Sequence, residues 1–583
     1  MAAPVVALVV GAYAHRWAAE DAYIDFRIIH NIWSGYGPVF NPGERVEVFT
    51  DPLWVFILSV FGWLLPLVRL AWWAVILGIT AAAGGFLLGA RAAQRLAAWR
   101  GLPTAIPLGL IAASVIDGVW DFASSGLETG LIFGWEGLSW WLLVRAATTT
   151  RGFAVTAFVV GLGELIRPDL GLLTITFLAA LAVIIYFSRP QRPMSALRRW
   201  AVPAVVAAGV PVVYQVWRMA YFAMITPNTA LAKSAGRSWW SQGARYFGDF
   251  VTADRLYVPL VVLTVVIVAR LAGAGYHRDW VSGVVLAAPV LGGAADWAYV
   301  VRVGGDFMHA RMLVPGLFAV GLAAWVCGPR VRAPSLRPPS LGAPRVTVLS
   351  VVPIALITGF AIVCVAHLRY ANTGQIMANG ITNERLFWVR ESGSPHPVTA
   401  DEYRTRIRIG TDLAALARTV PPKSVEVSLI DMVNGAYTGP PRPFLAGRPE
   451  RVIAEDVNIG LTGASAGAHV YIYDLLSLAD PVGSHTTLAT RGRPGHEKTI
   501  GSEWLVARFL PAGATVPAAG PAQQVAAARA ATWCGPLHAY LHAITTPLSL
   551  QQLLGNVSHS VGYTRMTFSA TPTLAAQKLC AHS

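Results

Sequence analysis

Long hydrophobic stretches separated by short polar segments fill the first two-thirds of the chain. Several of them lie near the lower length limit for crossing the hydrocarbon core of a membrane. The pattern predicts about eleven membrane-spanning helices, over roughly 1–14, 71–90, 103–118, 130–147, 152–166, 169–187, 199–219, 256–273, 280–300, 311–328 and 347–367. A further apolar run, Pro52 to Leu65, would break the alternation of loops between the two sides if it crossed. We therefore expect it to form an interfacial or re-entrant helix.

The pattern changes after Leu368, where Pro, Gly, Asp and Glu interrupt short runs of apolar residues. Segments such as GLTGASAGAHVYIYD (Gly460 to Asp474) combine β-branched and aromatic residues with turn formers, which is typical of mixed strands and helices. The sequence therefore predicts a polytopic α-helical membrane domain over 1–367, followed by a mixed α/β domain over 368–583.

The charge of the chain agrees with a membrane protein better than with a nucleic-acid-binding protein. Of 583 residues, 55% are hydrophobic and only 13% are charged, and the net charge is +14. The arginines gather in short loops between apolar runs, as cytoplasmic loops do under the positive-inside rule. These loops are Arg91 to Arg100, Arg145 and Arg151, Arg189 to Arg199, Arg270 to Arg278, and Pro329 to Arg345. We expect a multi-pass protein of the plasma membrane with no nucleic-acid partner.

The odd number of spans puts the C-terminal domain on the extracytoplasmic face. Cys534 and Cys580 belong to that domain, where they either form a disulfide or remain two thiols. The same topology carries five polar segments to the outer face, and ionisable residues at the ends of spans favour a functional site. The segments are AEDAYIDFR (Ala19 to Arg27), SSGLETG (Ser124 to Gly130), ELIRPD (Glu164 to Asp169), TPNTALAK (Thr226 to Lys233) and GGDFMHAR (Gly304 to Arg311).

The first of these segments carries three carboxylates. Glu20 and Asp21 are adjacent and diverge on a helix, whereas Asp21 and Asp25 are four residues apart and share a face. Two like charges on one face favour a bound divalent cation (Mg, Mn or Ca), held by Glu20 and Asp21, or a carboxylate with a raised pKa that acts as a general base. The alternative is an interfacial helix whose acids meet only water and Arg27.

The order of motifs resembles GT-C membrane glycosyltransferases, in which an acidic pair opens the first outer loop. AEDAYIDFRIIHN is followed by SGLET (Ser125 to Thr129), RPD (Arg167 to Asp169), PNT with its later lysine (Pro227 to Lys233), GGDFM with its arginine (Gly305 to Arg311) and RPGHEK (Arg493 to Lys498). This order is similar to that of actinobacterial arabinosyltransferases, above all the terminal β-(1→2)-arabinofuranosyltransferases of the AftB type. Many relatives carry Asp at the position of Glu20.

The resemblance implies that the chain takes arabinofuranose from a decaprenylphosphoryl-arabinofuranose donor. It further implies transfer to a 2-hydroxyl at the non-reducing end of arabinan in arabinogalactan or lipoarabinomannan. We find no GxGxxG or P-loop in a strand-to-helix setting, and so expect no nucleotide cofactor. Asp21, Glu20 and Asp25 are the candidate catalytic residues. The leaving phosphate needs positive charge and fixed donors, for which the candidates are Arg311, His309, Lys233, Asn228 and Arg27, supported by Asp306, Glu128 and Arg167.

Other interpretations stay open at this point. Arg311 and Lys233 could serve only as anchors in the lipid headgroups. The fold would also suit another polyprenyl-phosphate-sugar transferase, with a mannosyl or a different arabinosyl donor. A lipid-sugar transporter would show internal repeats, and we see none. His485, His496 and Glu497 match no strong zinc spacing, so we expect structural or acceptor contacts from a domain that caps the site and holds carbohydrate.

Overall fold

The structure is a computed structural model that describes residues 2–188, 196–328, 348–366, 376–377, 379–420, 424–430, 437–438, 442–443, 450–487, 490–513, 516 and 519–581. The chain folds into two compact units that interleave along the sequence. The first, which we call the helical unit, comprises Met1–Trp17, Ala74–Pro211 and Trp239–Phe387. The second, the mixed unit, comprises Ala18–Trp73, Val212–Ser238 and Trp388–Ser583.

The predicted division of the chain at Leu368 does not coincide with these units. Two early segments, which carry the acidic stretch and the PNT stretch, belong to the same unit as the C-terminal region. Leu368 itself and the predicted cytoplasmic loop Pro329 to Arg345 lie outside the described residues, so the domain boundary stays a prediction.

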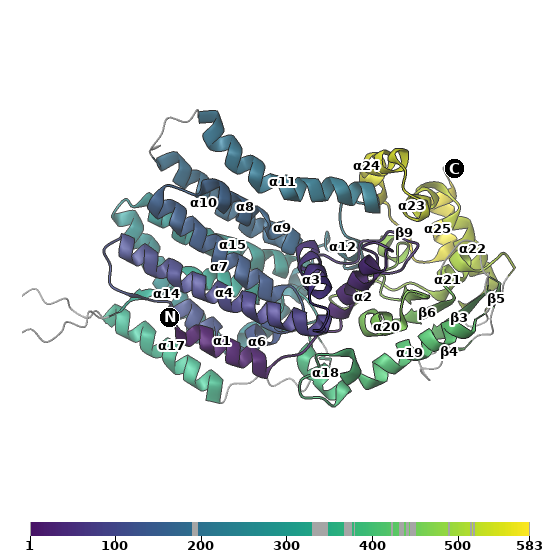
Figure 1. The fold of residues 1–583 in the computed structure, drawn as a ribbon, viewed down its shortest axis with the longest axis horizontal. Coiled ribbons are helices and arrows are strands. Elements are labelled where there is room, and N and C mark those ends of the chain that lie inside the picture. Colours follow the sequence, from purple (N-terminus) through teal and green to yellow (C-terminus); the bar gives the residue numbers. More distant parts are fainter. Residues whose placement is uncertain are drawn as a thin grey trace, which may run out of the picture. The chain divides into compact units, whose positions relative to one another are not determined.

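The helical unit is built mainly from apolar helices. Figure 1 shows α7, α10, α14 and α15 lying alongside one another. The helices α7, α10, α14 and α16 each pack against α15. The elements are α1 (Ala2–Ala14), β1 (Ala105–Ile106), α5 (Leu108–Ala113), α6 (Asp117–Ala123), α7 (Thr129–Thr149), α8 (Phe153–Gly161), α9 (Gly163–Ile166), the 3-10 helix η1 (Pro168–Leu170), α10 (Gly171–Phe187), α13 (Trp240–Ala253), α14 (Tyr257–Tyr276), α15 (Trp280–Val303), α16 (Val314–Ala323), β2 (Val326–Cys327) and α17 (Val348–Ala366). Three more helices are divided between the units: α4 (Leu70–Trp99), α11 (Ala196–Phe222) and α18 (Glu384–Ser392).

The helices confirm a multi-pass membrane protein. Five helical stretches in the described part of the chain are long and apolar enough to cross a membrane: Leu70–Trp99, Pro168–Phe187, Arg198–Phe222, Tyr257–Tyr276 and Trp280–Val303. Shorter apolar helices follow the predictions at Ala2–Ala14, Phe153–Ile166, Val314–Ala323 and Val351–Ala366. The predicted count of about eleven spans is not confirmed, because these helices are shorter than the hydrocarbon core requires when they stand upright.

One predicted span differs clearly from the structure. Residues 103–118 do not form one helix but the short strand β1, the six-residue helix α5 and the start of α6. β1 pairs antiparallel with β2. β2 follows α16 and lies at the end of another predicted span, 311–328. Pro107 separates β1 from α5 and has no N–H to continue a hydrogen-bond ladder. Hydropathy reports only that both stretches are buried, and cannot report where their main-chain groups pair.

The mixed unit contains a small sheet around a β-α-β element. β3 (Ser424–Ile430), β6 (Val452–Asp456) and β7 (Val470–Asp474) are parallel, while β4 (Tyr437–Thr438) and β5 (Arg442–Pro443) pair antiparallel with β3. The helix α20 (Ile459–Ala466) connects β6 to β7, and α19 (Arg404–Thr419) packs on both strands and on α20. The carboxyl ends of β6 and β7 therefore lie at one edge of the sheet, where ligands commonly bind in open α/β sheets. The predicted mixed α/β character of this region is confirmed.

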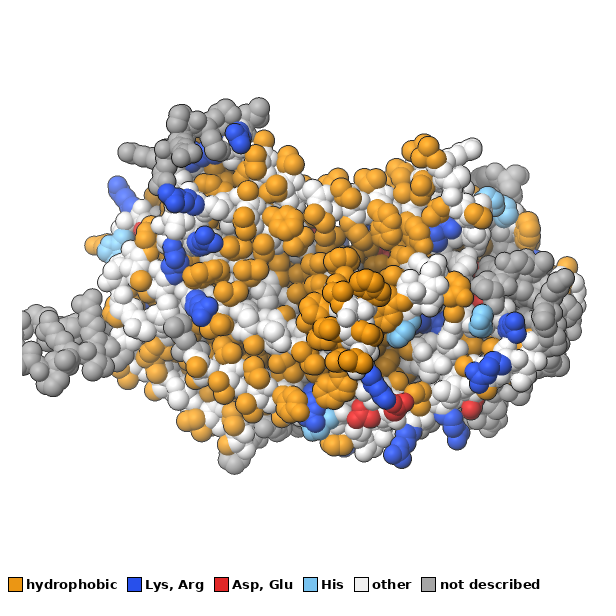
Figure 2. Space-filling model, viewed as in Figure 1, with side chains coloured by type: hydrophobic (Ala, Val, Ile, Leu, Met, Phe, Trp, Pro, Cys, Tyr) orange, Lys and Arg blue, Asp and Glu red, His pale blue; other side chains and the backbone are white. Residues whose placement is uncertain are grey.

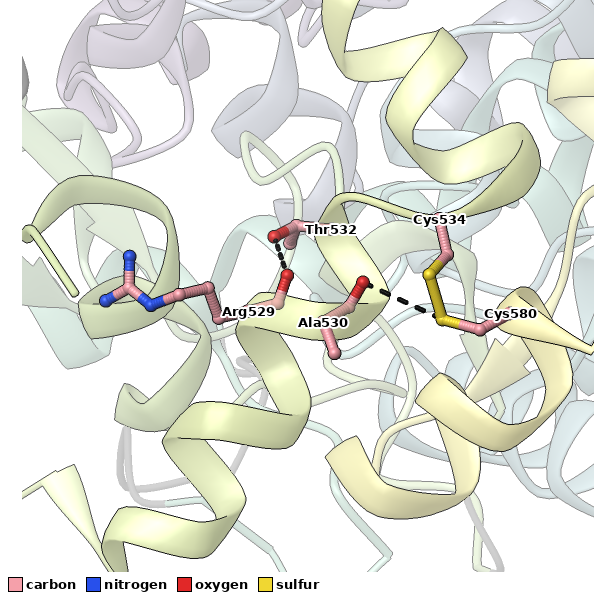
Figure 3. Close-up of a disulfide and its surroundings, with 5 residues drawn as sticks. All are labelled: Arg529, Ala530, Thr532, Cys534 and Cys580. Carbon is pink, nitrogen blue, oxygen red and sulfur yellow. Dashed lines mark hydrogen bonds between the residues drawn. A yellow bond between two sulfur atoms is a disulfide. The ribbon is translucent and has the colours of Figure 1, made fainter. Parts of the chain in front are cut away.

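The rest of the mixed unit is mainly helical. They are α2 (Ala22–Trp33), α3 (Pro52–Leu64), α12 (Asn228–Ala232), η2 (Ala400–Glu402), η3 (Gly483–His485), α21 (Ser502–Phe509), α22 (Ala522–Thr532), α23 (Gly535–Thr545), α24 (Leu550–Arg565) and α25 (Pro572–Cys580), and two further strands, β8 (Thr486–Thr487) and β9 (Phe568–Ser569), pair in parallel. Figure 3 shows a disulfide between Cys534, just before α23, and Cys580 at the end of α25, beside Ala530 of α22. Of the two alternatives for these cysteines, the structure has the bridge.

The helix α3 exposes an apolar surface. Figure 2 shows hydrophobic side chains gathered over it, and Phe56, Trp63 and Leu64 are more than half exposed. A contiguous exposed apolar surface is typical of contact with a membrane or a partner. This fits the predicted interfacial or re-entrant helix, although its placement in a membrane stays a prediction.

Candidate active site

The acidic stretch lies at the edge of the small sheet. Glu20 is buried, and its Oε1 accepts a hydrogen bond from the main-chain N–H of Leu461 at 3.0 Å. Leu461 belongs to the first turn of α20, where unpaired N–H groups favour a carboxylate. Glu20 therefore joins the segment that starts α2 to the helix that follows β6, and α2 packs against α20.

Glu20 and Asp21 differ in their surroundings. Burial, and next the charge of Asp21, raise the pKa of Glu20 well above its usual value. A raised pKa favours the protonated acid near neutral pH. Asp21 is half-buried and stands at the N-cap position of α2, but its side chain does not cap the helix. The two acids thus have different environments, which the sequence could not assign.

Asp25 and Arg27 lie in the first two turns of α2 and are both buried. The guanidinium of Arg27 donates hydrogen bonds to the main-chain carbonyls of Phe40 at 2.7 Å and Val470 at 2.8 Å, and also to that of Gly463. Burial lowers the pKa of Arg27 to about 9, so the side chain stays charged at neutral pH. Its donors hold the main chain around α20 and β7, which gives Arg27 a structural role instead of the predicted phosphate contact.

Asn228 begins α12 and is likewise committed to the main chain. Its side-chain NH2 donates to the carbonyls of Leu478 at 2.7 Å and Ser477 at 3.1 Å. Lys233, at the other end of α12, is half-buried. The Arg491 guanidinium donates to the carbonyl oxygen of Lys233 at 3.5 Å, so this lysine lies beside the RPGHEK turn. Of the predicted phosphate ligands in the mixed unit, Lys233 is the one whose charged group makes no hydrogen bond or ion pair within the described residues.

A second group of predicted residues meets within the helical unit. The buried carboxylate of Glu128 lies between two arginines, with Oε1 3.3 Å from Arg167 Nη1 and Oε2 3.6 Å from Arg311 Nη2. Arg311 Nη1 is 3.7 Å from Asp306 Oδ2. Arg167 also forms a two-pronged ion pair with Asp169, with both N–O distances at 2.7 Å. Four predicted residues are therefore brought together, along with Asp169, which the sequence reasoning had quoted only as part of the RPD motif.

The loop that carries Asp306 and Arg311 depends on two glycines. Gly304 and Gly305 follow α15 with φ of +108° and +74°, a region that side chains other than glycine rarely adopt. A Cβ at Gly305 would lie 2.4 Å from the ring of Tyr246, so a larger residue does not fit there. The GGD motif is thus the turn that directs the loop back toward Glu128.

His309, in the same loop, is enclosed by carboxylates. Its Nδ1 lies 2.6 Å from Asp249 Oδ2 and its Nε2 lies 3.6 Å from Asp254 Oδ2. Burial alone would lower the pKa of His309, but the hydrogen bonds with Asp249 and Asp254 outweigh it and raise the pKa to about 9. Both ring nitrogens therefore face acids, which argues for a structural charge and against the predicted phosphate contact.

The sequence of the whole chain is similar to two known enzymes. It is 30% identical to the "Terminal beta-(1->2)-arabinofuranosyltransferase" of Mycobacterium tuberculosis, over 96% of this chain and 94% of the relative. The chain belongs to the terminal arabinofuranosyltransferase family. A protein of the same name from Corynebacterium glutamicum is 28% identical over 96% of this chain and 84% of the relative, and residues 448–577 match the AftB family C-terminal domain.

Membership of the family confirms the resemblance to GT-C membrane glycosyltransferases that the ordered motifs indicated. This arabinofuranosyltransferase is an enzyme, which removes the lipid-sugar transporter from the alternatives. Among solved structures, ArnT from Cupriavidus metallidurans bound to undecaprenyl phosphate is 14% identical, covers 81% of this chain and 88% of its own, and superposes with a TM-score of 0.37.

The arabinofuranosyltransferase has an apolar groove in its mixed unit, with a volume of about 390 Å³. Aromatic and aliphatic side chains line it, among them Trp33 of α2, Val55 and Trp63 of α3, and Trp217 of α11. Its walls offer dispersion contacts and few polar partners, a surface that suits a hydrocarbon chain.

Glu20 and Asp21 do not by themselves fit the predicted divalent cation. One oxygen of Glu20 is engaged by the N-terminus of α20, and the described residues contain no group of three or more His, Cys, Asp or Glu side chains arranged to hold a metal ion. Ca²⁺ and Mg²⁺ take six or more oxygen ligands. We derive no step through a metal, and the cation stays a prediction, tested by measuring transfer before and after removal of divalent ions with EDTA.

The five segments predicted to face outward fall into two groups, one within each unit. The prediction that all five form one site stays a prediction. The sequence reasoning missed Asp249 and Asp254, which hold His309, because α13 carries no motif that marks them. It also assigned the RPGHEK turn to structure or acceptor contact, although its density of cations was a visible signal.

Proposed function

We propose that this protein transfers arabinofuranose from decaprenylphosphoryl-arabinofuranose to the 2-hydroxyl at the non-reducing end of an arabinan chain. The identity of 30% over nearly the whole chain with a terminal β-(1→2)-arabinofuranosyltransferase carries the proposal. The acceptor would be arabinan of arabinogalactan or lipoarabinomannan. The apolar groove beside α2 and α3 supports a donor with a long hydrocarbon chain.

Asp21 is the acid we assign as the base. It is half-buried, does not cap α2, and its charge acts on Glu20 and on His496. The acceptor oxygen forms a bond to the anomeric carbon, and its proton passes to the Asp21 carboxylate. The bond from the anomeric carbon to the phosphate oxygen breaks, and its electron pair stays on the phosphate. Glu20, whose pKa is raised by burial, serves as a positioning residue between α2 and α20.

The configuration at the anomeric carbon imposes a further requirement. A β-linked donor and a β-linked product retain configuration, whereas a single in-line displacement inverts it. Retention follows either from a carboxylate nucleophile with a second acid about 5 Å away, by analogy with retaining hydrolases, or from attack on the face that the phosphate leaves. Incubation with donor in the absence of acceptor separates the routes, because only the first adds the mass of one pentosyl group to the protein.

The site faces the extracytoplasmic side in this proposal. The disulfide between Cys534 and Cys580 supports this orientation, because such bonds persist in oxidising compartments. The arginine-rich loops of the helical region support it as well, since they favour the cytoplasm.

The decisive experiment supplies the purified full-length protein with defined donors. Decaprenyl phosphate carrying arabinofuranose, and the same lipid carrying mannose, are offered with a synthetic arabinan acceptor, and the product linkage is determined by NMR. We expect a new β-(1→2) linkage from the arabinose donor alone. Transfer from the mannose donor instead, or a different arabinose linkage, would replace the proposal with another polyprenyl-phosphate-sugar transferase.

A further inference from the structure

The RPGHEK segment forms a tight turn within the mixed unit. The main-chain N–H of Gly492 donates to the carbonyl of Glu497 at 3.1 Å, and that of His496 donates to the carbonyl of Arg493 at 3.0 Å. A Cβ at Gly492 would lie 2.2 Å from the carbonyl oxygen of His496, so the two arms approach too closely for a side chain there. The turn therefore holds Arg493 and His496 together, with Arg493 Nη2 3.4 Å from His496 Nε2.

This turn is attached to the segment that carries Lys233. Arg491 donates to the carbonyl oxygen of Lys233 at 3.5 Å and forms an ion pair with Glu497 at 3.3 Å. Within the part of the chain that the structure describes, the Lys233 ammonium forms no ion pair or hydrogen bond. Lys233 thus brings a positive charge to the turn that no carboxylate neutralises by direct contact.

Among the charges that act most strongly on the titratable groups of this turn, cations outnumber acids. The cations are Lys233, Arg237, Arg491, Arg493 and Lys498, and the acids that act on the same groups are Glu497 and Asp21. Burial and then Arg493 lower the pKa of His496 to about 4, and burial and then Arg237 lower that of Lys498 to about 8. A half-buried surplus of like charge costs free energy unless an anion binds to it.

The turn is within electrostatic range of the base assigned above. Asp21 is among the charges that act on His496, together with Lys233. In a phosphate-linked sugar donor the anomeric carbon is bonded to a phosphate oxygen. A phosphate held by these cations would therefore carry the reacting carbon toward Asp21.

We propose that Lys233, Arg493 and His496 form the binding site for the phosphate group of the lipid-linked donor. Lys233 and Arg493 supply charge. His496 Nε2 lies 3.4 Å from Arg493 Nη2, and Nδ1 lies 3.4 Å from the carbonyl oxygen of Pro494, so the imidazole orients the Arg493 guanidinium. Arg493 offers the planar fork that matches two phosphate oxygens. Arg491, held by Glu497 and the Lys233 carbonyl, is a positioning residue. This site rests on the proposed function. It keeps Lys233 from the predicted phosphate ligands Arg311, His309, Lys233, Asn228 and Arg27, and it adds Arg493 and His496.

Binding of decaprenyl phosphate without any sugar tests the site directly. We would measure its affinity for purified full-length protein in nanodiscs by thermal shift and by a fluorescent competitor. Arg493→Gln and Lys233→Gln should each weaken it at least about tenfold, and Arg493→Lys should lose less. The matched control is Arg565→Gln, which removes an exposed arginine of α24 in the same unit. The affinity of a variant is compared with that of the parent only if the two proteins have the same melting temperature without ligand.

Two results would overturn the site. One is an unchanged affinity for decaprenyl phosphate in both glutamine variants. The other is an equal loss of binding to phosphatidylglycerol vesicles, which would make the turn a general headgroup contact and not a donor site. The probe carries no sugar, so a protein that used mannose would still show the predicted loss, and the outcome is independent of the test of the proposed function.

Discussion

The Glu20 carboxylate accepts a hydrogen bond from the main-chain N–H of Leu461, 441 residues later in the chain, at 3.0 Å. The contact ties the acidic stretch that precedes α2 to the first turn of α20, at the carboxyl edge of β6. Burial raises the pKa of Glu20 well above its usual value, which disfavours the charged form of this buried acceptor. Its neighbour Asp21 is the acid left for proton transfer.

Glu20→Gln should therefore retain activity within a few fold of the parent. The glutamine carbonyl can accept the Leu461 N–H as the acid does, and its NH2 group replaces the acid proton. Glu20→Ala should lower the melting temperature, because it leaves the N-terminus of a buried helix without that acceptor, at a cost of about 1 kcal/mol or more. A large loss of turnover in well-folded Glu20→Gln would instead identify Glu20 as the base.

Asp21→Asn should reduce transfer by about two orders of magnitude or more, because the amide cannot take the acceptor proton. Affinity for decaprenyl phosphate should change little, since the charge that binds the phosphate lies elsewhere. The measurement is turnover under saturating donor, with Asp25→Asn as a matched change on the same face of α2. If Asp25→Asn loses turnover and Asp21→Asn does not, the base is one helical turn further along.

The sequence predicted the helices of the membrane region well where a long apolar run continued without interruption, as in α10, α14 and α15. It failed at residues 103–118, where β1 pairs with β2 from a stretch some two hundred residues later. The hydropathy of a stretch indicates only that its side chains are buried. It does not indicate whether the main chain forms one helix or a strand followed by short helices.

The grouping of the candidate site residues could be predicted only in part, and whether they form the active site stays a prediction. Motif order identified Glu128, Arg167, Asp306 and Arg311, which the fold does bring together. Motif order could not show that the side chains of Arg27 and Asn228 donate their hydrogen bonds to main-chain carbonyls. Every residue type has a main-chain carbonyl, so these partners leave no mark in the sequence. The different roles assigned to Glu20 and Asp21 depend on how deeply each side chain is buried. The sequence does not reveal this difference between two adjacent acidic residues.

Glu128→Gln should destabilise the helical unit. It removes the buried negative charge between Arg167 and Arg311, and breaking a buried ion network typically costs about 3 kcal/mol or more. We expect a lower melting temperature in detergent, while Glu164→Gln, the same change at an exposed position of α9, should leave it unchanged. A normal melting temperature with lost turnover would place Glu128 in contact with substrate.

His309 should make stability depend on pH. Its pKa of about 9 in the folded protein exceeds the usual value of about 6.5 in an unfolded chain. The charged form is thus favoured by folding, on the order of 3 kcal/mol, fully below pH 6.5 and progressively less as pH rises through 9. The melting temperatures of the parent and His309→Gln should differ most near pH 6 and converge toward pH 9.5. A gap that widens with pH would show that a neutral imidazole is the stabilising form.

The disulfide gives a test of orientation. In intact cells, a membrane-impermeant maleimide should label Cys534→Ser, which frees the thiol of Cys580, and should not label the parent until a reducing agent is added. Tags in 368–583 or in the 35–51 loop should be accessible from outside, and tags in 329–345 only from inside. The bridge closes a separation of 46 residues and stabilises the folded protein by about 4 kcal/mol through chain entropy, so its loss should also lower the melting temperature.

Two results together would place the C-terminal region in the cytoplasm. They are free thiols at both positions in protein taken from cells, and tags in 368–583 that are reached only after the membrane is opened. An extracytoplasmic transfer reaction would then be excluded.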